Sequence, residues 1–292
     1  MKKFLPFKEA REMVLKESPK HGINTERKWQ YQNKYGYERP HMVPYSPNIA
    51  YKNKGWVSWS HWLGTNNIRG TLRRYIVNDH FFKKWSGDMA YVFGFWAADG
   101  YIRKRWDRYS YEYGFGICQQ SKDRYILEKI LEAMGSNNHI CCPKTRPNMS
   151  HFEINSQKIF NDVVKLGGLP RKSLVMRFPD IPKKYLPDFL RGYFDGDGCI
   201  SLNTKNHSVH CYFCSGSEKF IGKLQTILYD TWGIKGKPCY SSCFRLTFGM
   251  QDVLKLGNIM YGLGKSKIRL ERKYDKFNGL MKYRRQKYGS KK

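Results

Sequence analysis

The sequence predicts an α+β fold in which one structural unit is used twice. The stretch VFGFWAADGYI at 92–102 is echoed by LRGYFDGDGCI at 190–200. After each copy come two strands of alternating apolar and polar residues, an amphipathic helix, a hairpin and a short closing helix. A repeat of about one hundred residues is too long for a solenoid and suits two related half-domains. We therefore expect two pseudo-symmetric αββαββα half-domains, each with a four-stranded antiparallel sheet.

Each element follows from the spacing of its apolar residues. In the first half, the helix after the two strands has an apolar face made of Ile126, Leu127, Ile130, Leu131 and Met134. In the second half, the matching face is made of Phe220, Ile221, Leu224, Ile227 and Leu228. The expected strands of the first half are 101–106, 112–120, 139–144 and 151–156, with a closing helix at 157–168. Those of the second half are 199–204, 209–216, 236–241 and 243–249, with a closing helix at 251–264.

The chain before the repeat has a different character, with a short predicted helix (FLPFKEAREMV) and a loop rich in Pro and Trp. We expect a small aromatic-rich accessory module at 1–86, the half-domains at 87–182 and 183–281, and a basic tail at 282–292 that forms a flexible arm.

Charge points to a polyanionic partner. The chain has 53 Lys and Arg against 24 Asp and Glu, a formal net charge of +29 over 292 residues. Its apolar runs are too short for a spanning helix, and its N-terminus has no signal-peptide core. We therefore expect a soluble, intracellular protein that is not secreted and does not bind membranes, while the compartment stays open. The eight cysteines are expected to be reduced.

Small residues on the two repeated helices predict that these helices pack together. Gly94 and Ala98 are four residues apart in the first helix, as are Gly192 and Gly196 in the second, so each pair shares one helix face. A glycine inside a helix costs about 0.5–1 kcal/mol relative to alanine, and close helix packing offsets this cost.

If the two helices run parallel, the aspartates at their ends, Asp99 and Asp197, meet. Each is followed by a glycine, Gly100 or Gly198, which readily takes the left-handed conformation that ends a helix. Two carboxylates at two negative helix ends repel each other. A divalent cation such as Mg²⁺, which carboxylates, water and phosphates usually hold, would offset this repulsion.

These stretches resemble the paired motifs of LAGLIDADG homing endonucleases: VFGFWAADG and LRGYFDGDG each match the nine-residue pattern. The resemblance extends over roughly 88–285. It implies a metal site made of Asp99, Asp197, Gly100 and Gly198, with Mg²⁺ as cofactor and Mn²⁺ able to replace it. Asp195 has no counterpart, because Ala97 stands at the matching position, and it is expected only to support the helix end.

The resemblance also implies that the two sheets form a saddle lying in the major groove of DNA. Strands can read base edges there, Arg pairing with guanine and Asn or Gln with adenine. The expected groove-facing residues are Arg103, Lys104, Arg105, Gln119, Lys144, Arg146, Asn203, Lys205 and Arg245.

Basic residues near the scissile phosphates are a further implication of the resemblance, since charge develops on the phosphate oxygens during cleavage. Lys172 and Lys273 occupy corresponding places after the hairpin and helix of each half-domain. Lys265 and Lys267 compete with Lys273 for the second role.

The function implied by this resemblance is that of a monomeric homing endonuclease that makes a double-strand break at a long asymmetric site in DNA. An RNA-splicing maturase or a cleavage-inactive sequence-specific DNA-binding protein on the same fold is the alternative. From charge alone, a nucleic-acid packaging protein without sequence preference is a further one.

The N-terminal module resembles one unit of a repeat found beside some phage integrases, through FLPFKEAR and YKNKGWVSWSHWLGT. This implies an accessory role, with extra DNA contact through Lys52, Lys54, Arg69, Arg73 and Arg74. Trp56, Trp59 and Trp62 could stack bases, but we expect them to form the core of the module.

Four cysteines, Cys211, Cys214, Cys239 and Cys243, have spacings found in zinc sites. However, Cys211 and Cys214 are three apart in an alternating strand, so their side chains point to opposite faces. We therefore do not expect a zinc site.

Overall fold

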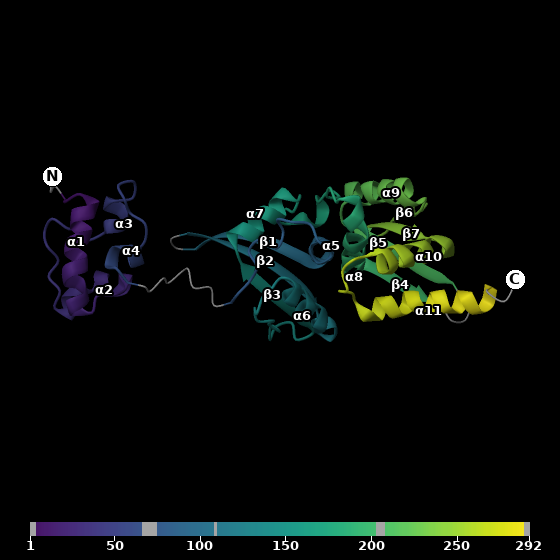
Figure 1. Ribbon diagram of the computed structural model, residues 1–292, viewed down its shortest axis with the longest axis horizontal. Coiled ribbons are helices and arrows are strands. Elements are labelled where there is room, and N and C mark those ends of the chain that lie inside the picture. Colours follow the sequence, from purple (N-terminus) through teal and green to yellow (C-terminus); the bar gives the residue numbers. More distant parts are fainter. Residues whose placement is uncertain (1–3, 66–74, 108–109, 203–207, 289–292) are drawn as a thin grey trace. The chain divides into compact units, whose positions relative to one another are not determined.

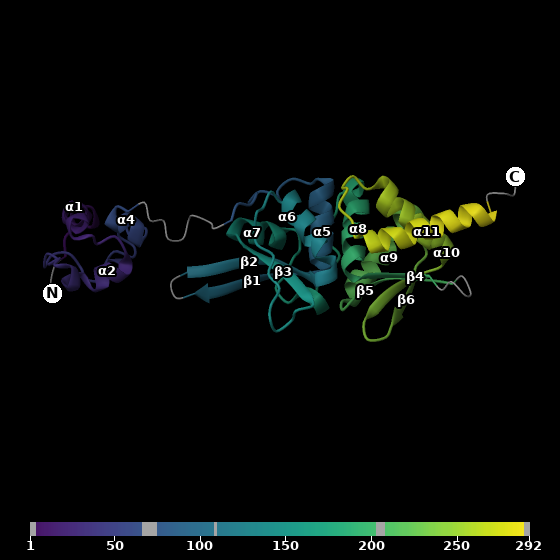
Figure 2. The same cartoon turned by 90° about the horizontal axis from the view of Figure 1, so that it is seen from below.

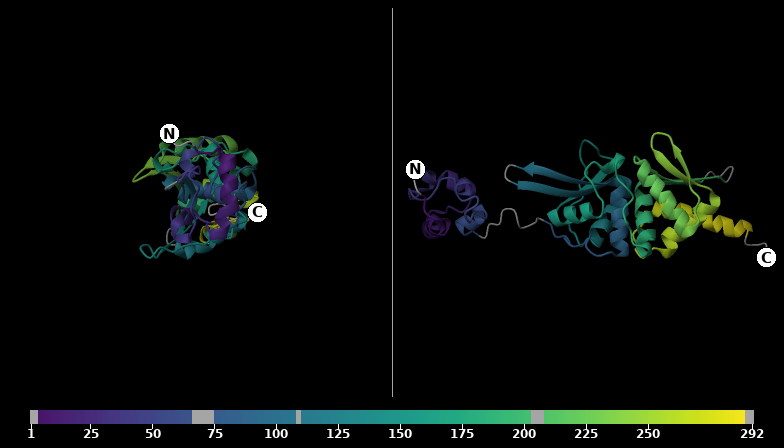
Figure 3. Two further views of the ribbon diagram at one scale, coloured as in Figure 1. Left: turned by 90° about the vertical axis from the view of Figure 1, so that its left-hand side faces the viewer. Right: turned by 90° about the horizontal axis from the view of Figure 1, so that it is seen from above.

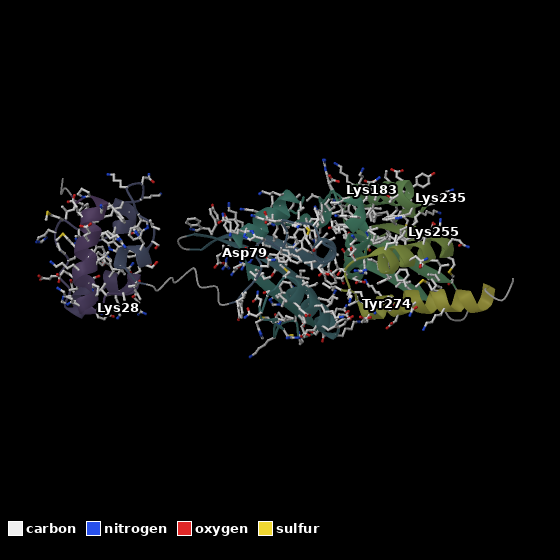
Figure 4. The ribbon with its side chains drawn as sticks, viewed as in Figure 1. Lys28, Asp79, Lys183, Lys235, Lys255 and Tyr274 are labelled. Atoms are coloured by element: carbon white, nitrogen blue, oxygen red, sulfur yellow. The ribbon has the colours of Figure 1, made fainter. Side chains whose placement is uncertain are left out.

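The computed structural model describes residues 4–65, 75–107, 110–202 and 208–288. The chain divides into two compact units between Arg74 and Tyr75 (Figure 1). Residues 75–86, expected to belong to the N-terminal module, pack with the second unit. There Phe81 and Phe82 join the core, and Asp79, labelled in Figure 4, accepts a hydrogen bond from the Ser156 hydroxyl.

The N-terminal unit is helical and is built around aromatic rings. Its helices are α1 (Phe7–Glu17), α2 (Glu26–Gln30), α3 (Pro47–Ala50) and α4 (Trp59–Leu63), with 3₁₀ turns at Ser18–His21 and Gln32–Tyr35. Trp29 and Trp62 are fully buried and meet edge to face, with ring centroids 5.8 Å apart. Trp56 and Trp59 pack against this core. The tryptophans therefore form the core, as the sequence predicts.

The first half of the second unit contains α5 (Gly87–Asp99), β1 (Gly100–Asp107), β2 (Ser110–Gln120), α6 (Arg124–Ala133), β3 (Met149–Asn155) and α7 (Gln157–Lys165). Its antiparallel sheet has the order β1-β2-β3. The prediction of four strands is wrong here. The expected strand at 139–144 forms only an isolated bridge between Cys141 and His151. Pro143, two residues on, has no N–H to continue a ladder.

The second half has the predicted four-stranded antiparallel sheet, in the order β4-β5-β7-β6. Its elements are α8 (Leu186–Asp197), β4 (Gly198–Leu202), β5 (Val209–Ser215), α9 (Glu218–Trp232), β6 (Lys237–Tyr240), β7 (Phe244–Phe248) and α10 (Met250–Asn258). A π-helical turn at Ile259–Leu263 and the long helix α11 (Glu271–Tyr288) follow. The expectation of a flexible arm from residue 282 is therefore wrong for 282–288, which continue this helix, while 289–292 lie outside the described residues. The second unit is thus an α+β fold with two antiparallel sheets.

The helices lie on one side of the second unit and the strands on the other, in both halves (Figures 2 and 3). In the first sheet, the residues facing the helices are buried, namely Ile102, Phe115, Ile117, Phe152 and Ile154. In the second they are Ile200, Cys211, Phe213, Leu246 and Phe248. The alternate residues of each strand face away from the helices. Each sheet therefore has one face packed on the core and one open face.

No helix within the described ranges is long and apolar enough to span a lipid bilayer.

Candidate active site

Helices α5 and α8 pack closely at the centre of the second unit. A Cβ atom on Gly192 would overlap the carbonyl oxygen of Tyr91, and one on Gly94 would overlap that of Phe189. Further along, a Cβ atom on Gly196 would overlap that of Ala98. Because these contacts advance together along both helices, the helices run parallel and end side by side.

The last residues of the two helices are Asp99 and Asp197. The Asp99 carboxylate lies 3.2 Å from the position that a Cβ atom on Gly196 would occupy, one residue before Asp197. Both side chains are half-buried. Parallel packing thus brings the two acids to one place from positions 98 residues apart in the sequence.

The glycines after these aspartates differ from the expectation. Gly100 has φ −95° and Gly198 φ −82°, so both are extended and not left-handed. A Cβ atom on Gly100 would overlap the Trp96 ring, and one on Gly198 the Phe194 ring. Glycine is needed here for the close passage of the chain over an aromatic ring as it leaves the helix for the sheet.

Burial raises the pKa of both carboxylates, and the charge of Asp197 adds to the rise at Asp99. The pKa of Asp99 is raised to about 7, first by burial and then by the nearby charge of Asp197. Lys273, Lys172 and a hydrogen bond from Gln119 act against this rise. The pKa of Asp197 is also raised by burial, and both lysines oppose that rise.

Lys172 and Lys273 are buried beneath the helix ends. The Lys172 ammonium donates to the Ala98 carbonyl at 2.9 Å. The Lys273 ammonium lies within 3.3 Å of four carbonyl oxygens, those of Phe194, Asp195, Gly196 and Gly198. Cations at helix C-termini satisfy unpaired carbonyls and oppose the negative end of the dipole.

The two lysines therefore serve the same element in each half. Burial lowers the pKa of each to about 8. Lys265 lies elsewhere, with its ammonium 5.7 Å from the centroid of the Tyr185 ring. Of Lys265 and Lys273, the two candidates for the second basic residue whose contacts the structure describes, only Lys273 lies at the helix ends.

Asp195, expected only to support the end of its own helix, forms hydrogen bonds to two other segments of the chain. Its side chain is fully buried, and Oδ2 accepts from the Tyr91 hydroxyl at 2.7 Å and from the Leu270 N–H at 2.7 Å. Leu270 immediately precedes α11, which carries Lys273. Asp195 therefore ties both paired helices to the segment that delivers the capping lysine.

Gln119 lies on the opposite face of β2 from the one that the sequence predicted. It is buried, and its Nε2 donates to Asp99 Oδ2 at 3.1 Å. It lies on the helix-facing side of β2 together with Phe115 and Ile117. Residues two apart on a strand share a face, so the alternation of apolar residues predicts this position for Gln119. Its side chain therefore contacts Asp99 and does not lie on the open face of the sheet.

The other expected groove-facing residues of the first half are divided. Arg103 and Arg105 lie on the open face of β1, where they pair with Glu153 and Glu112. Lys104 is on the opposite face, with its ammonium 4.2 Å from the centroid of the Tyr111 ring. Lys144 and Arg146 are exposed in the loop before β3 and not in a strand.

In the second half, Arg245 lies on the open face of β7, with its guanidinium 5.0 Å from the centroid of the Tyr212 ring. Asn203 and Lys205 lie outside the described residues, as do Arg69, Arg73 and Arg74 of the N-terminal part.

Strand β5 runs unbroken through Cys211 and Cys214. The Cys214 thiol donates to the Asp197 carbonyl at 2.8 Å.

The donor set at the helix ends suits a magnesium ion. Mg²⁺ prefers oxygen ligands and is usually held by one or two carboxylates together with water and phosphate. Within the described ranges, neither Asp99 nor Asp197 forms an ion pair, and no cluster of three or more His, Cys, Asp or Glu side chains could hold a metal. A cavity of about 60 Å³ beside Asp197 and Lys172 has room for several water molecules.

Comparison with known proteins agrees with the motif in the second half. Residues 185–240, which include α8 and Asp197, match the model of the LAGLIDADG-like domain. No curated protein matches the chain.

Among solved structures, the chain is similar to the LAGLIDADG meganuclease I-AabMI bound to uncleaved DNA, with 14% identity over 68% of this chain and 91% of that one and a TM-score of 0.47. It is similar to the meganuclease I-SmaMI bound to DNA, with 15% identity over 66% and 88% of the two chains and a TM-score of 0.48. A third is the homing endonuclease I-LtrWI bound to its target DNA, with 13% identity over 72% and 92% and a TM-score of 0.47.

Proposed function

We propose that the protein is a metal-dependent, sequence-specific DNA endonuclease of the homing type. The observation that carries the proposal is the meeting of Asp99 and Asp197 at the ends of two tightly packed parallel helices, between two sheets with open faces. The match of 185–240 to the LAGLIDADG-like domain supports it.

Double-stranded DNA is the proposed partner. The net charge of +29 favours a polyanion, and lysines such as Lys183, Lys235 and Lys255 are exposed over the second unit (Figure 4). Arg103, Arg105 and Arg245 lie on the open faces that would enter the major groove. The two halves differ in sequence within one chain, so the target would be asymmetric and the protein a monomer.

Asp99 and Asp197 would hold the metal, which supplies charge stabilisation at the scissile phosphate and lowers the pKa of water at that place. Gln119 orients the Asp99 carboxylate. Lys172 and Lys273 are buried against carbonyl oxygens at the two helix ends, so we assign them to positioning these ends and to lowering the negative potential around the aspartates.

Selection of bound duplexes from a randomised DNA library in Ca²⁺, followed by incubation of the selected DNA with Mg²⁺, tests the proposal. Double-strand cleavage at one position is expected, as is retained binding without cleavage for Asp197→Asn. Tight, selective binding without cleavage in Mg²⁺ and Mn²⁺ would identify a DNA-binding protein. Binding without sequence preference would identify a packaging protein.

A further inference from the structure

Three polar side chains form one rigid array on the open face of the first sheet. The Tyr101 hydroxyl donates to Glu153 Oε2 at 2.9 Å, and Arg103 Nε donates to the same oxygen at 2.8 Å. Arg103 Nη2 donates to Glu153 Oε1. Burial of Glu153 raises its pKa, but the bonds from Arg103 and Tyr101 outweigh burial and the pKa is lowered. The carboxylate therefore stays ionised.

Two glycines on β2 make this array possible. Gly116 stands between Tyr101 of β1 and Glu153 of β3 in the strand register, and Gly114 stands opposite Arg103. A Cβ atom on Gly114 would lie 2.9 Å from Arg103 Cγ and 3.0 Å from Glu153 Cδ, and one on Gly116 would overlap the Tyr101 ring. The side chains of β1 therefore lie flat across β2 and reach β3.

The bonds to Glu153 orient the guanidinium of Arg103. They use Nε and Nη2, one edge of the planar fork, and leave Nη1 and the second hydrogen of Nη2 on the other edge. The Arg103 side chain is 34% exposed. An edge with two parallel N–H groups matches O6 and N7 of guanine in the major groove.

The array stands close to the paired aspartates. Arg103 is three residues after Gly100, where β1 begins directly after Asp99, so its Cα lies roughly 10 Å along the strand from that of Gly100. With about 3.4 Å between successive base pairs, a strand that follows the groove places Arg103 about three base pairs from the aspartates.

We infer that Arg103 reads a guanine about three base pairs from the paired aspartates, and that Glu153 is the positioning residue that presents it. The inference rests on the proposed DNA-binding function. The contact between Arg103 and guanine would determine sequence preference in the half of the DNA site that the first sheet, β1-β2-β3, binds. Loss of the Glu153 carboxylate would free the Arg103 side chain, which would keep its charge near the phosphates but lose its preference for guanine.

The test compares base preferences selected by wild type, Glu153→Gln, Arg103→Lys and the control Glu128→Gln. Glu128 pairs with Arg124 on the exposed surface of α6, on the helix side of the sheet. Each protein selects from the same randomised duplex library in Ca²⁺. Duplexes that carry G·C or A·T at the position where wild type selects guanine then compete for binding.

Wild type and Glu128→Gln should prefer G·C at one position by about 5- to 100-fold. Glu153→Gln and Arg103→Lys should reduce that preference to less than about 3-fold while preferences elsewhere are kept. Arg103→Lys retains the charge, so it still tests the inference if Glu153→Gln fails to fold.

Retention of every base preference in either variant would overturn the inference, and a lowered melting temperature with preferences intact would make Glu153 a structural residue. A wild-type protein without base preference anywhere would overturn the proposed sequence-specific function itself, and the inference with it.

Discussion

The two helix ends that carry Asp99 and Asp197 share a backbone arrangement but are supported differently. At the second end, Lys273 lies against four carbonyl oxygens, and Asp195 bonds to Tyr91 and Leu270. At the first end, Lys172 binds one carbonyl, and Ala97 stands where the second half has Asp195. The acids and the helix contact are thus common to both halves, whereas the groups that hold them are not.

Substitutions at the shared helix contact should have the largest effect, and an equal one in both halves. Gly192→Val and Gly94→Val each place a side chain where a carbonyl oxygen of the other helix lies. We expect each to lower the free energy of unfolding of the second unit by more than about 3 kcal/mol, because the helices must separate. Thermal and urea unfolding measure this loss.

The matched control is Gly222→Ala, in the interior of α9. Nothing lies within 4 Å of the position of its Cβ atom. Alanine there should be neutral or stabilise the protein by up to about 1 kcal/mol. A small effect at only one of Gly94 and Gly192 would show that the contact is not shared equally.

Replacing the two buried lysines should have different effects on stability in the two halves. Lys273→Met leaves several carbonyls at the end of α8 without their donor, whereas Lys172→Met leaves one at the end of α5. Unpaired buried groups cost about 1–3 kcal/mol each when they cannot relax. We expect a loss of about 3 kcal/mol for Lys273→Met and about 1–2 kcal/mol for Lys172→Met in urea unfolding. Equal losses in the free energy of unfolding for the two variants would contradict the proposal that the two helix ends are supported differently.

The substitution Asp99→Asn should have a smaller effect on stability, and this effect depends on pH. The Asp99 pKa is raised from 3.8 to about 7, so between these values the folded, metal-free protein holds a proton that the unfolded chain has lost. The free energy of unfolding therefore falls as pH rises from about 4 to 7, and Asp99→Asn lacks this fall.

In EDTA at pH 8, Asp99→Asn should melt about 2–8 °C above wild type, with the difference shrinking towards pH 4.5. Mg²⁺ should raise the melting temperature of wild type and not that of the variant. A difference that does not change with pH would contradict the raised pKa of Asp99.

The sequence was sufficient for the features that depend on local pattern. The repeated motif, the small residues on one helix face and the alternation of the strands predicted the paired helices and nearly all of the strands. The missing strand at 139–144 has a local cause in Pro143, which lacks the N–H that would continue the ladder. Gln119 could also have been placed by its alternation with Phe115 and Ile117.

Features that depend on distant segments were beyond sequence reasoning. Lys273 reaches carbonyls more than 70 residues away, and Asp195 bonds to Leu270 across a similar separation. The Tyr101, Arg103 and Glu153 array requires the exact strand register, since Glu153 comes 50 residues after Arg103. Neither the composition nor the spacing of these residues predicts such contacts.

The central claim is that the two helix ends form one metal-dependent site for DNA cleavage. The most direct measurement is cleavage, in Mg²⁺, of a plasmid carrying a DNA site selected by the wild-type protein. We predict that wild type linearises this plasmid, while Asp99→Asn and Asp197→Asn bind the site in Ca²⁺ with wild-type affinity and do not linearise it. Linearisation by either variant at the wild-type rate would contradict the account.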